Sequence, residues 1–131
     1  MTTENLASLT NDELAKCFME VSLREDRAFL EEDFSDEDAL SHPVLDDIAR
    51  HRKAIVKTLD ARGVDARRVL LPLLDHQNDQ VRFDAAKYLQ LREPERAFAT
   101  LRELAAGGPG MPSALARSTL RFAEQGIGKP P

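Results

Sequence analysis

The stretch from Val69 to Leu104 constrains the fold most, because its apolar residues recur at helical spacing in three consecutive segments. Two short polar turns separate these segments, one at residues 75–79 ("DHQND") and one before Pro94. Helix, turn, helix, turn and helix in succession form the pattern of stacked helical hairpins, which offer binding surfaces more often than active sites. No segment alternates with the period of two that strands require. We therefore expect an all-α protein.

Six helices are expected along the chain from apolar periodicity and capping residues. In order they cover residues 11–31, 43–62, 65–74, 79–90, 94–106 and 112–125. Pro72 lies inside the third helix, where it removes a backbone hydrogen bond and bends the axis. Outside a single helical domain at residues 10–126, we expect a flexible arm at 1–9 and an extended tail at 127–131.

The chain has one cysteine, Cys17, which therefore cannot form an internal disulfide. Cys17 lies in an apolar helical stretch, so its expected role is that of a buried small hydrophobe. The first residues lack the basic and apolar regions of a signal peptide, and no apolar run approaches the roughly 18 residues that span a bilayer. These features predict a cytoplasmic protein in a reducing compartment that does not enter the membrane.

Charge is distributed unevenly about a net charge of −5. Up to Ile48 the chain has 14 acids against 3 bases, whereas from Ala49 onward it has 9 acids against 15 bases. Mutual repulsion favours a loop in the densest acidic run, and the absence of glycine argues against a calcium loop. The run is either a solvated loop or a surface that docks a basic partner protein. Its six carboxylates belong to Glu31, Glu32, Asp33, Asp36, Glu37 and Asp38.

Two pairs of side chains have the spacing of metal ligands on a helix, His42 with Asp46 and Asp47 with His51. A metal site requires three or four ligands, and no further ligand lies at motif spacing. A metal-dependent hydrolase built on these residues is therefore the least favoured of three hypotheses. The sequence has no nucleophile elbow or phosphate loop, and an acidic chain without interleaved aromatic residues is a poor partner for nucleic acid. We expect no enzymatic activity and no cofactor.

The turn at residues 75–79 also places His76 beside Asp75, which invites a catalytic interpretation with Ser113 or Cys17 as the nucleophile. No motif supports that interpretation. A structural role is favoured instead. In that role a side chain such as Asn78 accepts hydrogen bonds from the start of the next helix, and Arg82 bridges to a carboxylate of the turn.

The segment at residues 70–91, "LLPLLDHQNDQVRFDAAKYLQL", resembles one HEAT-type repeat. In that repeat a leucine-rich first helix often contains a proline, a short Asp/Asn turn follows, and the second helix begins Val-Arg and continues Ala-Ala and Leu. The matching positions are Leu70, Pro72, Leu73, Leu74, Asp75, Asn78, Val81, Arg82, Ala85, Ala86 and Leu89. The resemblance covers one repeat and implies a short HEAT/armadillo-like stack of about six helices, an α-α superhelix that caps itself.

The chain as a whole resembles a small bacterial family of domains of unknown function, number 2019, over residues 14–130. The segments "DARRVLLPLLDHQNDQVRFDAAKYL", "PERAFATLREL" and "ARSTLRFAEQGIGKP" carry this resemblance. It implies a HEAT-like fold without an assigned activity. Members look like companions of secreted-toxin genes, a setting in which small acidic proteins act as immunity proteins.

We therefore expect a non-enzymatic protein-binding domain. In its most specific form it is an immunity-type inhibitor that binds a basic toxin domain through the acidic residues between Glu31 and Asp38. The alternative is a self-associating helical scaffold or adaptor, which would be a homodimer.

Overall fold

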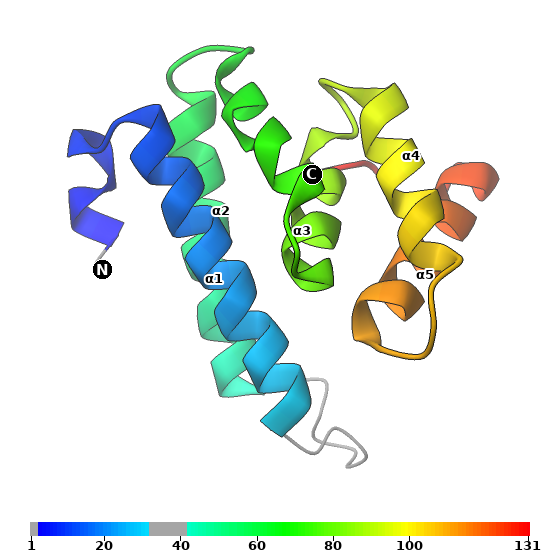
Figure 1. Ribbon diagram of the computed structural model, residues 1–131. Coiled ribbons are helices and arrows are strands. Elements are labelled where there is room, and N and C mark those ends of the chain that lie inside the picture. Colours follow the sequence, from blue (N-terminus) through cyan, green and yellow to red (C-terminus); the bar gives the residue numbers. More distant parts are fainter. Residues whose placement is uncertain (1–2, 32–41) are drawn as a thin grey trace. The chain divides into compact units, whose positions relative to one another are not determined.

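The computed structural model describes residues 3–31 and 42–131. Within these ranges the chain is helical, with five α-helices, two 3-10 helices and no strand, which confirms the all-α prediction (Figure 1). None of these helices is long and apolar enough to cross a membrane. In chain order the elements are η1 (Thr3–Ser8), α1 (Asn11–Glu31), α2 (Pro43–Asp60), η3 (Ala66–Asp75), α3 (Asp79–Leu89), α4 (Pro94–Ala105) and α5 (Met111–Gln125).

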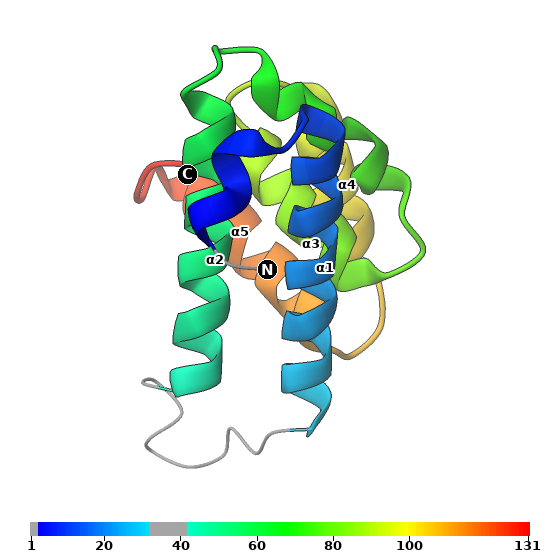
Figure 2. The same ribbon diagram turned by 90° about the vertical axis from the view of Figure 1, so that its left-hand side faces the viewer.

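The chain divides into two compact units, of which the first, Met1–Ala66, contains a hairpin of α1 and α2 (Figure 2). α1 begins with the predicted capping box: Thr10 N–H donates to Glu13 Oε1 at 2.9 Å, and Glu13 N–H donates to Thr10 Oγ1 at 3.1 Å. The hydrogen bond from the Thr10 backbone lowers the pKa of Glu13, because it stabilises the charged carboxylate. The buried apolar side chains of the hairpin are Leu14, Cys17, Phe18, Val21 and Ala28 from α1, with Ile48, Ile55, Val56 and Leu59 from α2.

Three features of this unit refine what the sequence predicts. Residues 3–8 lie in the segment expected as a flexible arm or a short preliminary turn, and they form η1, which packs against α2 and buries Leu6. His42 is the N-cap of α2, and its Nδ1 accepts a hydrogen bond from Val44 N–H at 3.2 Å. Helical spacing predicts a core position for Val44, but its side chain is exposed, because it lies in the first turn of α2, before the buried stripe begins.

The second compact unit, Arg67–Pro131, begins within η3 and contains α3, α4 and α5. The third expected helix is a 3-10 helix over Ala66–Asp75 and not a bent α-helix. Pro72 lies inside it and has no N–H to donate, so α-helical bonding would be interrupted here, and the chain takes the tighter winding. α4 packs against both α3 and α5.

The core of this second unit is built around α3, where seven of eleven residues are buried. Asn78 caps the helix as predicted: its Oδ1 accepts hydrogen bonds from Gln80 N–H at 2.9 Å and Val81 N–H at 3.1 Å. Gly126 ends α5 in a left-handed conformation with φ +67°, and Ile127 N–H donates to the Phe122 carbonyl at 2.9 Å. The principal apolar core residues are Leu70, Leu74, Val81, Ala85, Ala86, Leu89, Ala97, Leu101, Leu104 and Ala116.

Candidate partner-binding surface

The predicted acidic surface lies on the connection between α1 and α2. Glu31 is the last residue of α1 and is exposed, whereas the five acids between Glu32 and Asp38 lie outside the described residues. Two exposed apolar side chains flank the connection in the sequence. Leu30 is 79% exposed and Val44 is 41% exposed. We call Leu30, Glu31 and Val44, together with the acidic sequence that they flank, the hairpin tip.

Half of the basic side chains of the first unit form hydrogen bonds within it. The unit has 16 acids and 8 bases, a balance of −8, whereas residues 67–131 have 7 acids and 10 bases, a balance of +3. Four of the eight bases form hydrogen bonds inside the unit, namely Arg24, Arg50, Arg52 and Arg62. Several acids instead project to the surface, namely Asp12, Glu20, Glu31 and Asp46. The unit as a whole therefore carries a net negative charge.

Asp47 and His51, one of the two predicted metal pairs, do meet across one turn of α2. The distance from His51 Nε2 to Asp47 Oδ1 is 3.8 Å. Arg24 of α1 contacts both residues, since its Nη2 lies 3.1 Å from Asp47 Oδ2 and its Nη1 lies 3.1 Å from His51 Nδ1. Arg50 adds a weaker contact to Asp47 Oδ1 at 3.4 Å. The hydrogen bond from Arg24 is the main reason that the pKa of Asp47 is lowered.

This arrangement already supplies the Asp47 carboxylate with positive charge, so a divalent ion would have to displace Arg24. In the other pair, His42 Nδ1 is used as the cap of α2, and Asp46 is exposed in the first turn of that helix. Across residues 3–31 and 42–131, no three His, Cys, Asp or Glu side chains are grouped as metal ligands would be.

The pair of Arg52 and Glu25 is a feature that the sequence interpretation missed. Arg52 Nη2 lies 2.7 Å from Glu25 Oε1, and the two side chains are only 9% and 14% exposed. Because the basic run at residues 50–53 ("RHRK") is only four residues long, the sequence predicts a solvated face there, yet Arg52 is buried. The helical spacing of Arg52 could have indicated its burial. Arg52 lies four residues after Ile48 and four before Val56, within the buried stripe of α2.

The turn before α3 has the structural role expected of it. His76 Nδ1 accepts a hydrogen bond from Asn78 N–H at 2.9 Å, so this histidine helps to shape the turn. Arg82 pairs with Asp79 at the start of the same helix at 3.6 Å and with Glu103 of α4 at 3.2 Å. Cys17, the other nucleophile considered, is buried, and this burial raises the pKa of its thiol.

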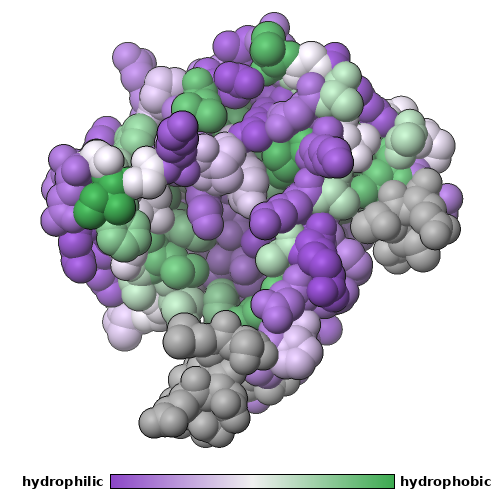
Figure 3. Space-filling model, turned by 180° about the vertical axis from the view of Figure 1, so that it is seen from behind, coloured by the Kyte–Doolittle hydropathy of each residue, from purple (hydrophilic) through white to green (hydrophobic). Residues whose placement is uncertain are grey.

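The last helix exposes part of its predicted apolar side. Helical spacing predicts that Leu115, Ala116, Thr119, Leu120 and Phe122 face inward, but among them only Ala116 is fully buried, and Phe122 is 50% exposed. Met111 is exposed as well, at 38%. At 100° per residue, Met111, Leu115 and Phe122 share one side of the helix, which we call the α5 face. Figure 3, a view from behind, shows apolar side chains interrupting an otherwise hydrophilic surface.

Comparisons with known proteins give a family and a fold. The family model described as "Domain of unknown function (DUF2019)" matches residues 12–121. The chain is also similar to the crystal structure of the protein RPA1889 from Rhodopseudomonas palustris CGA009, with 26% sequence identity and a TM-score of 0.81. That similarity covers 96% of this chain and 98% of the other. No curated protein matches the chain.

Proposed function

The chain belongs to the DUF2019 family, whose description assigns no activity, and from that premise we propose that it is a non-enzymatic protein-binding domain. In this proposal the hairpin tip binds a basic partner. The observation that carries it is the position of the acidic run, on a helix–helix connection between exposed Leu30 and exposed Val44. In its most specific form the protein is an immunity-type inhibitor that occludes a basic toxin domain.

The hairpin tip combines apolar and acidic side chains, as the surfaces that bind proteins commonly do. Protein interfaces combine a buried apolar centre with a polar rim, and charge on the rim speeds diffusional encounter more than it strengthens the final complex. Leu30 and Val44 would supply apolar contacts, and the carboxylates around them would supply the rim. Because exposed charges are screened over about 10 Å at 0.1 M salt, capture should depend on ionic strength.

The internal pairing of bases strengthens this argument. Arg24 and Arg50 are bound to Asp47, and Arg52 is bound to Glu25, so each of these three cations already has a carboxylate partner within the unit. We further propose that α3, α4 and α5 form a short HEAT-like stack. The adjacency of consecutive helices supports it, and the additional packing of α5 on α3 fits a stack that is its own cap.

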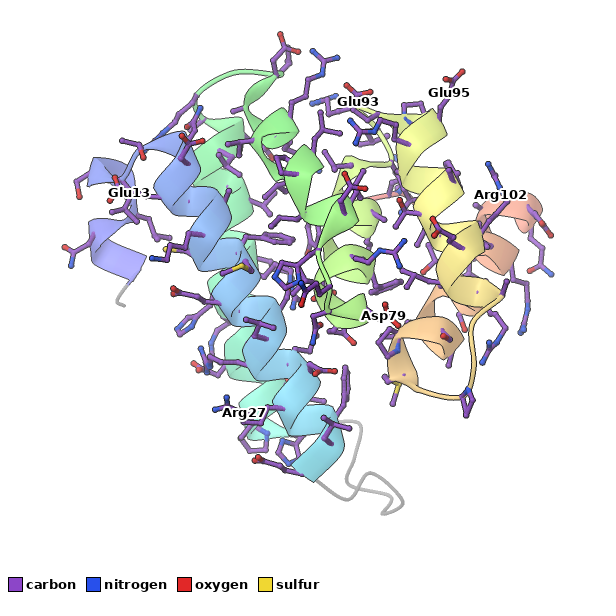
Figure 4. All side chains as sticks on the ribbon, viewed as in Figure 1. Glu13, Arg27, Asp79, Glu93, Glu95 and Arg102 are labelled. Atoms are coloured by element: carbon purple, nitrogen blue, oxygen red, sulfur yellow. The ribbon has the colours of Figure 1, made fainter. Side chains whose placement is uncertain are left out.

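A capture experiment with three baits tests the binding proposal. The tip variant carries Glu32→Gln, Asp33→Asn and Glu37→Gln. The control variant carries Asp75→Asn, Glu95→Gln and Glu124→Gln, which changes the charge equally at exposed positions of the second unit. Figure 4 shows Glu95 pointing away from α4.

We expect wild type and control to retain one basic protein from a lysate of the source cells at low salt and to release it at high salt, while the tip variant fails to retain it. Equal retention by all three baits would contradict a role for the tip, and so would no retention by any of them.

A self-associating scaffold is the second candidate, and the α5 face favours it. Exposed apolar patches on soluble proteins commonly mark contact surfaces. If the face joins two copies, sedimentation equilibrium should give a dimer for wild type and for Leu91→Ser, an exposed apolar residue elsewhere, but a monomer for Phe122→Ser. A monomeric wild type would eliminate this candidate.

A further inference from the structure

Arg67 is a buried arginine in the second unit. It lies at the start of η3, and only 8% of its surface is exposed. Its Nη1 donates to the Tyr88 carbonyl at 3.1 Å, and its Cζ lies 5.9 Å from the centroid of the Tyr88 ring. The Tyr88 carbonyl is among the last four of α3, which have no partner within the helix, so the guanidinium caps the negative end of that helix. The ring in turn supports the cation.

The same nitrogen holds the end of the described chain. Arg67 Nη1 donates to the Pro131 carbonyl at 2.5 Å. The chain arrives there from α5 through Gly126 and Gly128, both left-handed, with φ +67° and +73°. Figure 1 shows this red segment running back from α5 to end beside η3. We call residues 126–131 the tail strap. Its residues 126–130 are exposed, and Pro131 is half-buried.

We infer that Arg67 and Tyr88 form a docking site for an extended, proline-containing peptide segment, which the tail strap occupies in cis. The inference concerns the second unit and does not depend on the hairpin tip. The tail strap supplies the occupant: the backbone oxygen of its last residue, Pro131, accepts a hydrogen bond from a side chain that is more than nine-tenths buried.

The chemistry of the site suits that class of ligand. A proline has no N–H, so the backbone of a Pro-Pro segment can only accept hydrogen bonds, through its oxygen atoms. The Arg67 guanidinium offers such a donor, and the Tyr88 carbonyl and ring hold it in place. Proline-rich segments are also extended before they bind, so docking them costs little conformational entropy, and aromatic side chains recur in the grooves that receive them.

Occupation in cis has a consequence for any partner. A tethered segment competes at an effective concentration of about millimolar, so a proline-containing peptide from another protein would bind weakly until the strap is displaced. The strap therefore restricts access to the Arg67–Tyr88 site.

The chain provides its own reporter for a test. Tyr88 is the single tyrosine and there is no tryptophan, so the intrinsic fluorescence of the protein comes from this site. Gly128→Val disfavours the left-handed conformation that the strap uses. Gly108→Val is the matched control, since a Cβ there meets nothing within 4 Å and no positive φ is required. Acrylamide quenching of the fluorescence measures how accessible Tyr88 is.

We expect quenching to rise in Gly128→Val and to stay at the wild-type level in Gly108→Val, with equal helix content by circular dichroism. The peptide GIGKPP, added to Gly128→Val at about millimolar concentration, should restore the protection, whereas GIGKGG should not. Arg67→Lys keeps the charge but loses the planar guanidinium group. Quenching of Tyr88 should therefore rise in this variant, and the peptide GIGKPP should not reverse the rise.

Three results would overturn the inference. The first is unchanged quenching of Tyr88 in Gly128→Val, and the second is a rise in quenching that GIGKPP does not reverse. The third is that GIGKPP and GIGKGG lower the quenching equally.

Discussion

Arg52 of α2 forms an ion pair with Glu25 of α1 that is largely shielded from water. A guanidinium and a carboxylate that are both shielded from water have lost their hydration, and close contact offsets that loss. Asp47 is the contrasting case, since it is about two-fifths exposed and its partners are arginines on the surface. The sequence identifies these residues as charged but does not indicate which of them pair, because pairing depends on how the two helices are set against each other.

Removing one member of the buried pair should be costly. We expect Arg52→Ala to lower the free energy of unfolding by about 3 kcal/mol, because Glu25 is left buried with its charge. The double variant Arg52→Met with Glu25→Leu should recover most of that loss. Urea unfolding of the three proteins measures both effects, and a double variant no more stable than Arg52→Ala would show that the pair is not the cause.

The stability contributed by Asp47 should depend on pH in one direction. Its pKa is lowered in the folded state, mainly by the hydrogen bond from Arg24, so the unfolded chain takes up the proton more readily. The contribution is therefore present above the ordinary value of 3.8 and is lost as the pH falls through the lower folded value. Wild type should exceed Asp47→Asn in urea midpoint at neutral pH by a small margin that closes in acid. A margin that widens in acid would contradict the assignment.

At the scale of elements, the local sequence explains where most helices begin and end. The capping box of α1, the Asn78 cap of α3 and the glycine end of α5 depend on neighbouring residues and were predictable for that reason. The winding of Ala66–Asp75 was not, because periodicity does not separate a 3-10 helix from an α-helix interrupted by proline. The exposure of Phe122 was also missed, since the sequence does not show which neighbours α5 has.

The cap of α3 gives a direct test at this scale. Asn78→Ala removes the acceptor for two backbone N–H groups and should lower the free energy of unfolding by about 1 kcal/mol. Asn78→Asp keeps an acceptor at this position and should retain most of the wild-type stability. Gln77→Ala, at an exposed position in the same turn, is the control. Thermal unfolding that ranks Asn78→Ala equal to Gln77→Ala would mean that the cap is dispensable.

At the scale of the whole molecule, two helical units of opposite net charge share one chain. Its all-α class and its family could be predicted from periodicity and from the quoted segments, because those signals are local or are carried by residue identity. The candidate site could be predicted only as an acidic run. That exposed Leu30 and Val44 flank it, and that the nearby arginines are engaged elsewhere, depends on tertiary packing. These features together make the hairpin tip the centre of the functional account.

The association rate of the captured basic protein tests that account most directly. It should be measured by stopped flow against wild type, the tip variant and the control variant over a range of salt concentrations. The account predicts slower association and a flatter salt dependence for the tip variant alone, because steering by the tip carboxylates is reduced. Identical rates for the tip variant and wild type at low salt would contradict it.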